Sequence, residues 1–279
     1  MGREGRRTHC KSHLAVLLMD KKHAYVLGCP ISRLTLDQFV EAAEAFIKSR
    51  RPHYISVVNV AKIVKMRSDR RLNSSVKSAD LIGADGVPLV WASRLLGDPL
   101  PGRVNGTDLM YRLLEQADEK GYRVFFFGAK EEVLQAVLTR VRSEYPGVQI
   151  AGWQDGYFKP EDEWNIARKI RGSRADVLFI AFGTPKKELW VARYLGAMAV
   201  PVVHGVGGSF DVFAGLIPRA PVWMQKAGLE WLFRLLQEPG RMWKRYLVTN
   251  SLFIALLIKE LFRVKLGWSK SQPARRGSV

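Results

Sequence analysis

Cysteine is scarce in this sequence, and acidic residues are few relative to basic ones. Only Cys10 and Cys29 occur among 279 residues, so at most one disulfide could form and no Cys/His spacing typical of a zinc site is present. We therefore expect a reducing, cytosolic environment. Lys and Arg outnumber Asp and Glu by 44 to 26, a formal charge of +18. Such a charge attracts polyanions, whether nucleic acid, anionic lipid or a diphosphate.

Long apolar runs are also missing. The basic residues 1–11 are not followed by the apolar stretch and cleavage site of a signal peptide, because residues 14–19 are too few and run into Asp20. The longest apolar stretch, residues 251–258, is far below the ~20 residues that cross a bilayer. The sequence thus predicts a chain that can lie on a membrane without spanning it.

The commonest nucleotide-binding motifs are absent as well. There is no D-x-D carboxylate pair to hold a diphosphate through a divalent cation, and the acidic cluster at residues 161–163 indicates a helix N-terminus instead. Residues 183–188 lack the Walker A spacing, and residues 205–210 lack the last glycine of a dinucleotide fingerprint. We therefore expect no metal, and a Rossmann-type oxidoreductase is only an alternative function.

Short β-rich runs alternate with segments of helical periodicity from about residue 33 to residue 208, which predicts a parallel sheet flanked by helices. Thr35 and Gln38 form a predicted capping box at the start of a helix over residues 35–50. We expect strands over residues 54–60, 81–84, 123–127, 149–153, 176–182 and 200–206. Further helices are expected over residues 108–120, 131–145, 161–170 and 186–195.

The residues best suited to bind a ligand or to take part in catalysis follow these strands. Ligands bind at this end of the strands in open parallel sheets. They are Asn59, Asp85, Gly86, Gly128, Asp155, Tyr157, Gly183, Pro185, Gly207, Gly208 and Asp211. Asp85 is the candidate general base, because burial or nearby positive charge would set its pKa; the alternative is an ordinary Asp-Gly turn. Arg103 is either a phosphate clamp or a solvated loop arginine, and Asn59 is either a ligand or a cap.

The composition changes after about residue 216. Residues 219–279 hold twelve Lys or Arg and three Glu, so this part carries half of the net charge. Trp and Leu are interleaved with these cations, which is typical of a helical segment at a membrane interface. A helical layer packed on the sheet is the alternative. Nucleic-acid binding is less favoured, since the cations concentrate in a tail rich in Leu, Ile and Trp.

These observations divide the chain into four parts. We expect a partly flexible N-terminal segment over residues 1–32 and a catalytic core over residues 33–215. A basic amphipathic appendage follows over residues 216–268, and residues 269–279 form a disordered tail.

Taken in order, the motifs resemble the WecG/TagA/CpsF glycosyltransferases, which act in the synthesis of teichoic acid linkage units, enterobacterial common antigen and capsular or exopolysaccharides. The resemblance covers roughly residues 54–245. Its carriers are VVN at residues 57–59, ADGVP at 84–88, RVNGTDL at 103–109, FFFG at 125–128, residues 152–157, FGTPKKE at 182–188, residues 205–215, RAP at 219–221, and GLEWLFRL at 228–235 with Glu238 and Pro239.

The resemblance implies a Rossmann-like core and a C-terminal helical appendage that contacts the inner membrane leaflet. It implies an inverting, metal-independent and cofactor-free transfer of a sugar from a UDP-sugar to an undecaprenyl-diphosphate-linked saccharide. Asp85 matches the proposed base of the family, Asn59 and Arg103 match its active-site neighbours, and Arg234 and Arg241 match arginines that close over the diphosphate. The resemblance therefore implies a cytoplasmic protein that is peripheral on the inner face of the plasma membrane. It does not fix the oligomeric state, and a homo-oligomer is one of the possibilities.

Two residues depart from the family pattern. Val57 stands where the family usually has Thr, and Lys187 stands where the family has Gln, between Pro185-Lys186 and Glu188. Valine removes a hydroxyl, and lysine adds a cation where an amide could both donate and accept. The donor sugar is therefore open among N-acetylmannosamine, glucose, another hexose and a uronic acid, whose carboxylate would suit a lysine.

Overall fold

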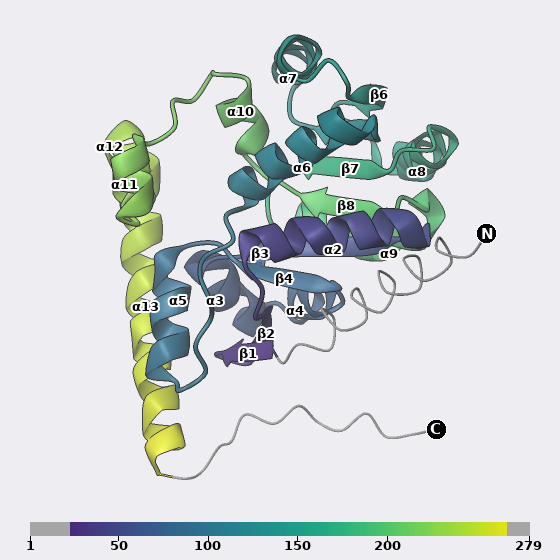
Figure 1. Cartoon of the computed structure of the whole chain (residues 1–279). Helices are drawn as coiled ribbons and strands as arrows, with labels where there is room; N and C mark the ends of the chain where they lie inside the picture. Colours follow the sequence, from purple (N-terminus) through teal and green to yellow (C-terminus); the bar gives the residue numbers. More distant parts are fainter. Residues whose placement is uncertain (1–22, 267–279) are drawn as a thin grey trace, which may run out of the picture.

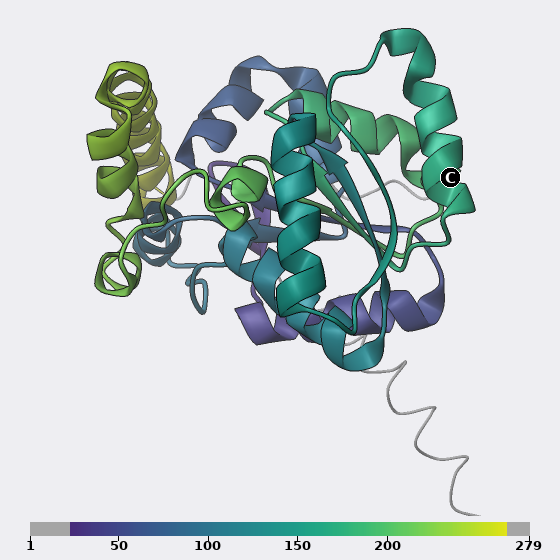
Figure 2. The same cartoon turned by 90° about the horizontal axis from the view of Figure 1, so that it is seen from above.

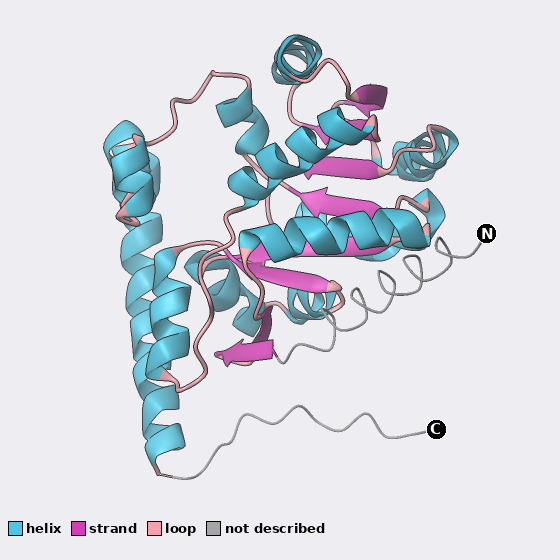
Figure 3. Ribbon diagram, in the orientation of Figure 1, coloured by secondary structure: helices cyan, strands magenta, loops and turns pink. Residues whose placement is uncertain are grey.

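Six parallel strands form the centre of the protein, whose computed structural model describes residues 23–266. They lie in the order β4-β3-β8-β7-β5-β6, and every neighbouring pair is parallel. Figure 1 labels these strands, and Figure 3 shows them in magenta in the same orientation. The strands are β3 His53–Val58, β4 Leu81–Ala84, β5 Arg123–Gly128, β6 Gln149–Gln154, β7 Val177–Ala181 and β8 Val202–Gly205. Each overlaps a strand predicted from the sequence, so the predicted α/β class with a parallel sheet is confirmed.

Helices cover both faces of the sheet, because the strands are apolar on both sides. One face packs against α2 Leu36–Ser49, α6 Gly106–Lys120, α7 Glu131–Glu144 and α10 Ser209–Phe213. The other face packs against α8 Glu163–Gly172 and α9 Lys186–Met198. The predicted capping box of α2 is confirmed: Gln38 N donates to Thr35 Oγ1 at 3.3 Å, and Thr35 N donates to Gln38 Oε1 at 3.1 Å.

The first third of the chain contains elements that the sequence patterns did not predict. They are the hairpin of β1 His23–Val26 and β2 Cys29–Ser32, and the helices α3 Val60–Ser68, α4 Arg70–Lys77 and α5 Val87–Leu95. The hairpin packs on the core: Val26 and Ile31 are buried in one cluster with residues of β4, and Ser32 Oγ accepts a hydrogen bond from Ile82 N at 3.0 Å. The remainder of the predicted N-terminal segment, residues 1–22, and the predicted tail, residues 269–279, lie outside the described residues.

Three helices follow the sheet at the C-terminal end of the described chain: α11 Val222–Lys226, α12 Glu230–Gln237 and α13 Pro239–Lys265. Seen from above, they form a group at one side of the molecule (Figure 2). In Figure 1, α13 runs beside α5 and α3. Phe253 is buried in the cluster that also holds α3 and the hairpin, so α13 packs on the core. Among residues 23–266, no helix combines the length and the apolarity needed to span a bilayer.

Phe126 offers a test of the packing below the site. Its ring is fully buried, with centroids 5.9 Å from Phe179 and 6.0 Å from Phe210, the latter on α10 just after β8. We expect Phe126→Ala to lower the free energy of unfolding in urea by about 3–5 kcal/mol, through lost burial and a residual cavity. Phe126→Leu keeps most of the volume, so its loss stays near ~1.5 kcal/mol. Equal losses for both variants would contradict this account of the core.

Candidate active site

The site forms where the carboxyl ends of three adjacent strands meet. Asn59 follows β3, Asp85 follows β4, and a glycine-rich loop, residues 205–208, begins at the end of β8. Because β4, β3 and β8 are neighbours in the sheet, these three segments lie side by side at one edge. Asn59 also caps α3, since its Oδ1 accepts a hydrogen bond from Lys62 N at 3.0 Å.

Asp85 is held in place at both its backbone and its side chain. Its N–H donates to Val58 O at 2.7 Å, and its Oδ1 accepts a hydrogen bond from Asn105 Nδ2 at 3.0 Å. Asn105 is in turn the N-cap of α6, with its Oδ1 accepting from Thr107 N and Asp108 N at 2.8 and 3.2 Å. Asn105 was not singled out from the sequence, although an asparagine directly before a helix is a recognisable cap signal.

The surroundings of Asp85 raise the pKa of its carboxyl group. Burial is the main cause, and the negative charge of Glu230 adds to it. Arg234, Lys62 and Arg103 act in the opposite direction, with Arg234 the strongest of the three. A carboxylate with a raised pKa is a better proton acceptor near neutral pH than an ordinary aspartate.

Two adjoining spaces meet at Asp85. The first, which we call the polar cavity, has a volume of about 690 Å³ and is lined by Val57, Asn59, Lys62, Gly183, Lys187, Gly207, Gly208 and Arg234, among others. The second, the apolar groove, has a volume of about 460 Å³ and lies between α5 and α13, where Trp91, Leu95, Tyr246, Phe253 and Leu257 line it. Asn59, Asp85, Asn105 and Arg234 belong to both linings. Asp85 therefore stands at the junction of a cationic space and an apolar one.

Two lysines and one glutamate form a buried cluster at the polar cavity. Lys62 Nζ lies 2.7 Å from Glu188 Oε1 and donates to Val57 O at 2.6 Å. Lys187 Nζ lies 3.5 Å from the same carboxylate oxygen, which also accepts from Thr184 Oγ1 at 3.1 Å. Burial opposes ionisation of Glu188, but the two ammonium groups outweigh this effect and lower the pKa of Glu188 to about 2. Glu188 is thus a carboxylate at neutral pH, held by the lysines.

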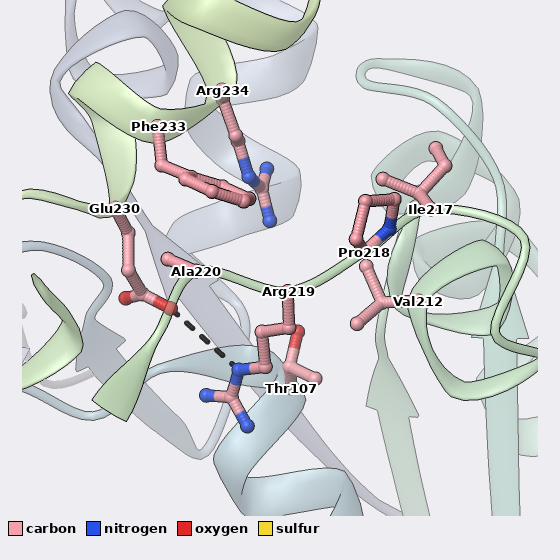
Figure 4. A pocket seen from close by; sticks show the side chains of 9 residues that line it. All are labelled: Thr107, Val212, Ile217, Pro218, Arg219, Ala220, Glu230, Phe233 and Arg234. Atoms are coloured by element: carbon pink, nitrogen blue, oxygen red, sulfur yellow. Dashed lines mark ion pairs between the residues drawn. The ribbon is translucent and has the colours of Figure 1, made fainter.

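Four charged side chains join the C-terminal helices to the core in an alternating ring. Arg103 pairs with Glu230 of α12, and Arg219 pairs with Asp108 of α6. The ring closes through longer contacts, from Arg103 Nη2 to Asp108 Oδ2 at 4.0 Å and from Arg219 Nε to Glu230 Oε1 at 3.7 Å. Figure 4 shows the Arg219–Glu230 pair beside Phe233 and Arg234, which project from α12. Arg103 therefore anchors α12, and its predicted contact with a phosphate stays a prediction.

Some of the other residues predicted for the site line one of these two spaces, and others do not. Gly86 lines the apolar groove, and Glu188 reaches the polar cavity only through its lysine partners. Neither lining includes the predicted residues Gly128, Asp155, Tyr157, Pro185 and Asp211. Arg241 lies on α13, and its side chain is outside the described residues. Lys62 and Asn105 belong to the site although they were not predicted for it.

Asp155 and Tyr157 illustrate why some of these residues lie elsewhere. They follow β6, the strand at the opposite edge of the sheet from β4, and Asp155 Oδ1 accepts a hydrogen bond from Tyr157 N at 2.7 Å. Gly128 has a structural reason to be glycine: its φ is +114°, and a Cβ there would lie 2.6 Å from Ala181 O. Its role is to let β5 and β7 approach closely.

Two features near the site bear on metal binding and on acid–base chemistry. Among residues 23–266 no group of three or more His, Cys, Asp or Glu is arranged to hold a metal ion. His204, on β8, is fully buried, with Nε2 3.0 Å from Gly106 O. Burial lowers the pKa of His204 to about 4, so its ring is neutral at physiological pH and links β8 to α6.

Comparison with known proteins shows the family of the chain. The profile of the glycosyl transferase WecG/TagA/CpsF family matches residues 24–266. The N-acetylglucosaminyldiphosphoundecaprenol N-acetyl-beta-D-mannosaminyltransferase of Bacillus spizizenii is 38% identical over 226 residues, 81% of this chain and 87% of the relative. The enzyme of the same name from Bacillus subtilis is 35% identical over 232 residues, 83% of this chain and 90% of the relative. The chain therefore belongs to the WecG/TagA/CpsF family of glycosyl transferases, as its sequence motifs predicted.

Proposed function

We propose that this glycosyl transferase moves a sugar from a UDP-sugar to a saccharide carried on undecaprenyl diphosphate, with inversion at the anomeric carbon. The observation that carries the proposal is the position of Asp85, which lines both the polar cavity and the apolar groove. One substrate is then a polar nucleotide sugar and the other has a long apolar chain. The names of both Bacillus relatives describe an acceptor of this kind.

The polar cavity suits the donor. Lys62, Lys187 and Arg234 supply positive charge around it, and the loop of residues 205–208 contributes glycines, where a ligand can approach the backbone closely. Cations and backbone N–H groups are the groups with which proteins hold a diphosphate. We therefore assign the UDP moiety to this cavity, with the sugar directed toward Asp85.

The apolar groove suits the acceptor. Its walls come from α5 of the core and from α13, and they carry aromatic and aliphatic side chains such as Trp91, Phe253 and Leu257. The first isoprenoid units of the lipid can bury apolar surface there, while the acceptor saccharide reaches the junction at Asp85. Arg103 lines this groove and not the polar cavity, and it faces the lipid diphosphate in this arrangement.

The transfer is a single displacement at the anomeric carbon. The acceptor hydroxyl oxygen forms the new bond to this carbon while the bond to the UDP oxygen breaks, and Asp85 accepts the hydroxyl proton. Asn105 keeps the carboxylate oriented, because its amide is itself fixed by capping α6. Charge that develops on the departing UDP is stabilised by Arg234 and the buried lysines.

The C-terminal helices would bring this site to the inner face of the membrane. Large apolar side chains are exposed on α5 and on α11–α13, including Trp91, Trp223, Trp243, Ile254 and Phe262. Lys244, Lys259 and Lys265 are exposed on α13 beside them. Interfacial tryptophans and cations together bind anionic bilayers, where the polyprenyl chain of the acceptor resides.

Asp85→Asn tests the base. We expect turnover of a UDP-sugar with a lipid-diphosphate-linked acceptor to fall by about 10²–10⁴-fold, because the amide cannot accept the proton. Donor binding, measured by calorimetry with UDP, stays close to that of the wild type. Asp37→Asn, on the exposed surface of α2, is the matched control. Turnover near the wild-type rate in a folded Asp85→Asn protein would refute the role.

Glu230→Gln tests the positioning of α12 by the ring of charges. Both arginines of the ring lose an ion-pair partner, so Arg234 is no longer held opposite Asp85. The loss of charged, partly buried hydrogen bonds predicts roughly a tenfold or greater fall in kcat, with UDP binding less affected. Glu260→Gln, which removes an ion pair to Arg263 within α13 and away from Asp85, leaves kcat unchanged. A lower Tm with an unchanged kcat would mean that the ring only stabilises the fold.

Trp243→Ser tests the membrane face. Trp243 of α13 is 54% exposed, and the control, Trp164→Ser on α8, removes a side chain that is 55% exposed. We expect Trp243→Ser to weaken binding to phosphatidylglycerol vesicles by about tenfold, from the apolar area no longer buried. High salt weakens binding of both proteins further. Equal vesicle binding by the two variants would rule out this face as the docking surface.

A further inference from the structure

The cluster of Lys62, Lys187 and Glu188 carries more positive than negative charge. These side chains are 7%, 5% and 0% exposed, so bulk water screens them poorly. Two ammonium groups share a single carboxylate, which leaves one positive charge uncompensated within the cluster. A buried charge is costly unless it is paired, so the cluster calls for a further anion.

The two lysines share the carboxylate unequally. Lys62 Nζ is 2.7 Å from Glu188 Oε1 and also donates to a backbone carbonyl, that of Val57. Lys187 Nζ is 3.5 Å from the same oxygen, beyond the length of a strong charged hydrogen bond. Lys62 is thus the principal partner of Glu188, and the positive charge that needs an anion belongs to Lys187.

The side chain of Lys187 is fixed so that its ammonium group reaches the cavity wall. A Cβ at Gly205 would lie 2.5 Å from Lys187 Cδ, so the aliphatic stem runs directly against the backbone at the end of β8. Its Nζ lies 3.7 Å from the position of a Cβ on Gly207, a residue that lines the polar cavity. Only glycine at position 205 leaves room for this path. The stem is clamped and the charged end lies at the glycine-rich loop.

The place of Lys187 in the fold opposes a positive charge when the cavity is empty. It lies in the first turn of α9, where the helix dipole is unfavourable for a cation. Burial and the charge of Lys62 lower the pKa of Lys187 to about 8, although Glu188 and Asp85 act in the other direction. His204, also close by, is neutral. A lysine that only filled space would not need this arrangement; an anionic ligand would offset its cost.

We propose that Lys187 binds an anionic group of the donor, either the diphosphate or a carboxylate on the donor sugar. The inference rests on the proposed function, because it takes the polar cavity as the donor site. In the carboxylate case, Lys187 selects uronic acid donors over neutral hexoses. In the diphosphate case, it holds the leaving group and is indifferent to the sugar.

Binding of UDP, UDP-glucose and UDP-glucuronate to the full-length protein, measured by calorimetry, distinguishes binding of the diphosphate from binding of the sugar carboxylate. We compare the wild type with Lys187→Gln, which keeps most of the side-chain volume without the charge, and with Lys120→Gln on the outer end of α6 as the matched control. If the sugar carboxylate is bound, Lys187→Gln weakens UDP-glucuronate by about tenfold or more and leaves the other two ligands within about twofold. If the diphosphate is bound, all three ligands weaken by a similar factor.

The pH dependence gives a second readout that a purely structural lysine would not produce. The ammonium form of Lys187 is lost as the pH rises through about 8, so wild-type affinity for the recognised anion falls between pH 7 and pH 9. Glu188 is ionised and His204 is neutral throughout this range. Asp85, whose pKa burial raises, also acts on Lys187 and is kept in the variant, so the part of the dependence that Lys187→Gln loses belongs to Lys187. Lys187→Gln that binds all three ligands like the wild type overturns this inference alone. A wild-type protein that binds none of them overturns the proposed function as well.

Discussion

The hydrogen bond from Asn105 Nδ2 to Asp85 Oδ1 joins the two parts of the chain on which the site depends. Asn105 uses its carbonyl oxygen to cap α6 and its amide nitrogen to orient Asp85, so one side chain starts a helix and positions a carboxylate. The loop before α6 is held against the end of β4, since Val104 N donates to Ala84 O at 2.8 Å. From this point the polar cavity extends in one direction and the apolar groove in the other.

The charges around that bond are balanced across distant parts of the chain. Arg234 and Glu230 come from α12, one turn apart, and act on the pKa of Asp85 with opposite signs. Glu230 also anchors α12 by its pair with Arg103, so the helix that carries Arg234 is fixed by a residue of the core. The acidity of Asp85 and the position of α12 are therefore coupled: moving α12 removes both a cation and an anion from the site.

The sequence predicted the strands well and the polar contacts poorly, for a physical reason. Strands β5 and β7 are uninterrupted apolar runs because both their faces are buried, and such a run is visible without knowledge of its neighbours. By contrast, Lys62 lies on a short helix of mixed composition, and nothing local indicates that it meets Glu188, 126 positions later in the chain. A buried lysine is recognisable only when its partner is known.

The order of the strands was likewise not predictable from local sequence, and it decides which of the predicted site residues lie together. All residues that follow a strand were expected at the carboxyl ends of the strands, and in this respect Asn59, Asp85 and Asp155 were equivalent. The order of the strands separates them: Asn59 and Asp85 follow the adjacent β3 and β4, whereas Asp155 follows β6 at the other edge. The alternating pattern of strands and helices predicts that the strands are parallel, but it does not determine which strands are neighbours. The sequence could therefore predict that these residues lie at the carboxyl ends of the strands, but not which of them lie close together.

In the proposed function, the apolar groove would connect membrane docking with acceptor binding, because its two walls come from different parts of the chain. One wall is α5, which presents the exposed side chains of Trp91 and Leu95, and the other is α13. Phe253 of α13 is buried in the same cluster as α5 and the N-terminal hairpin, so the second wall is held by packing as well as by the ring of charges. A lipid that enters between these walls touches the catalytic core and the C-terminal helices at once. Burial of its chain would then stabilise the arrangement in which Arg234 faces Asp85, and in the proposed function the apolar part of the acceptor would assist the chemistry at its polar end.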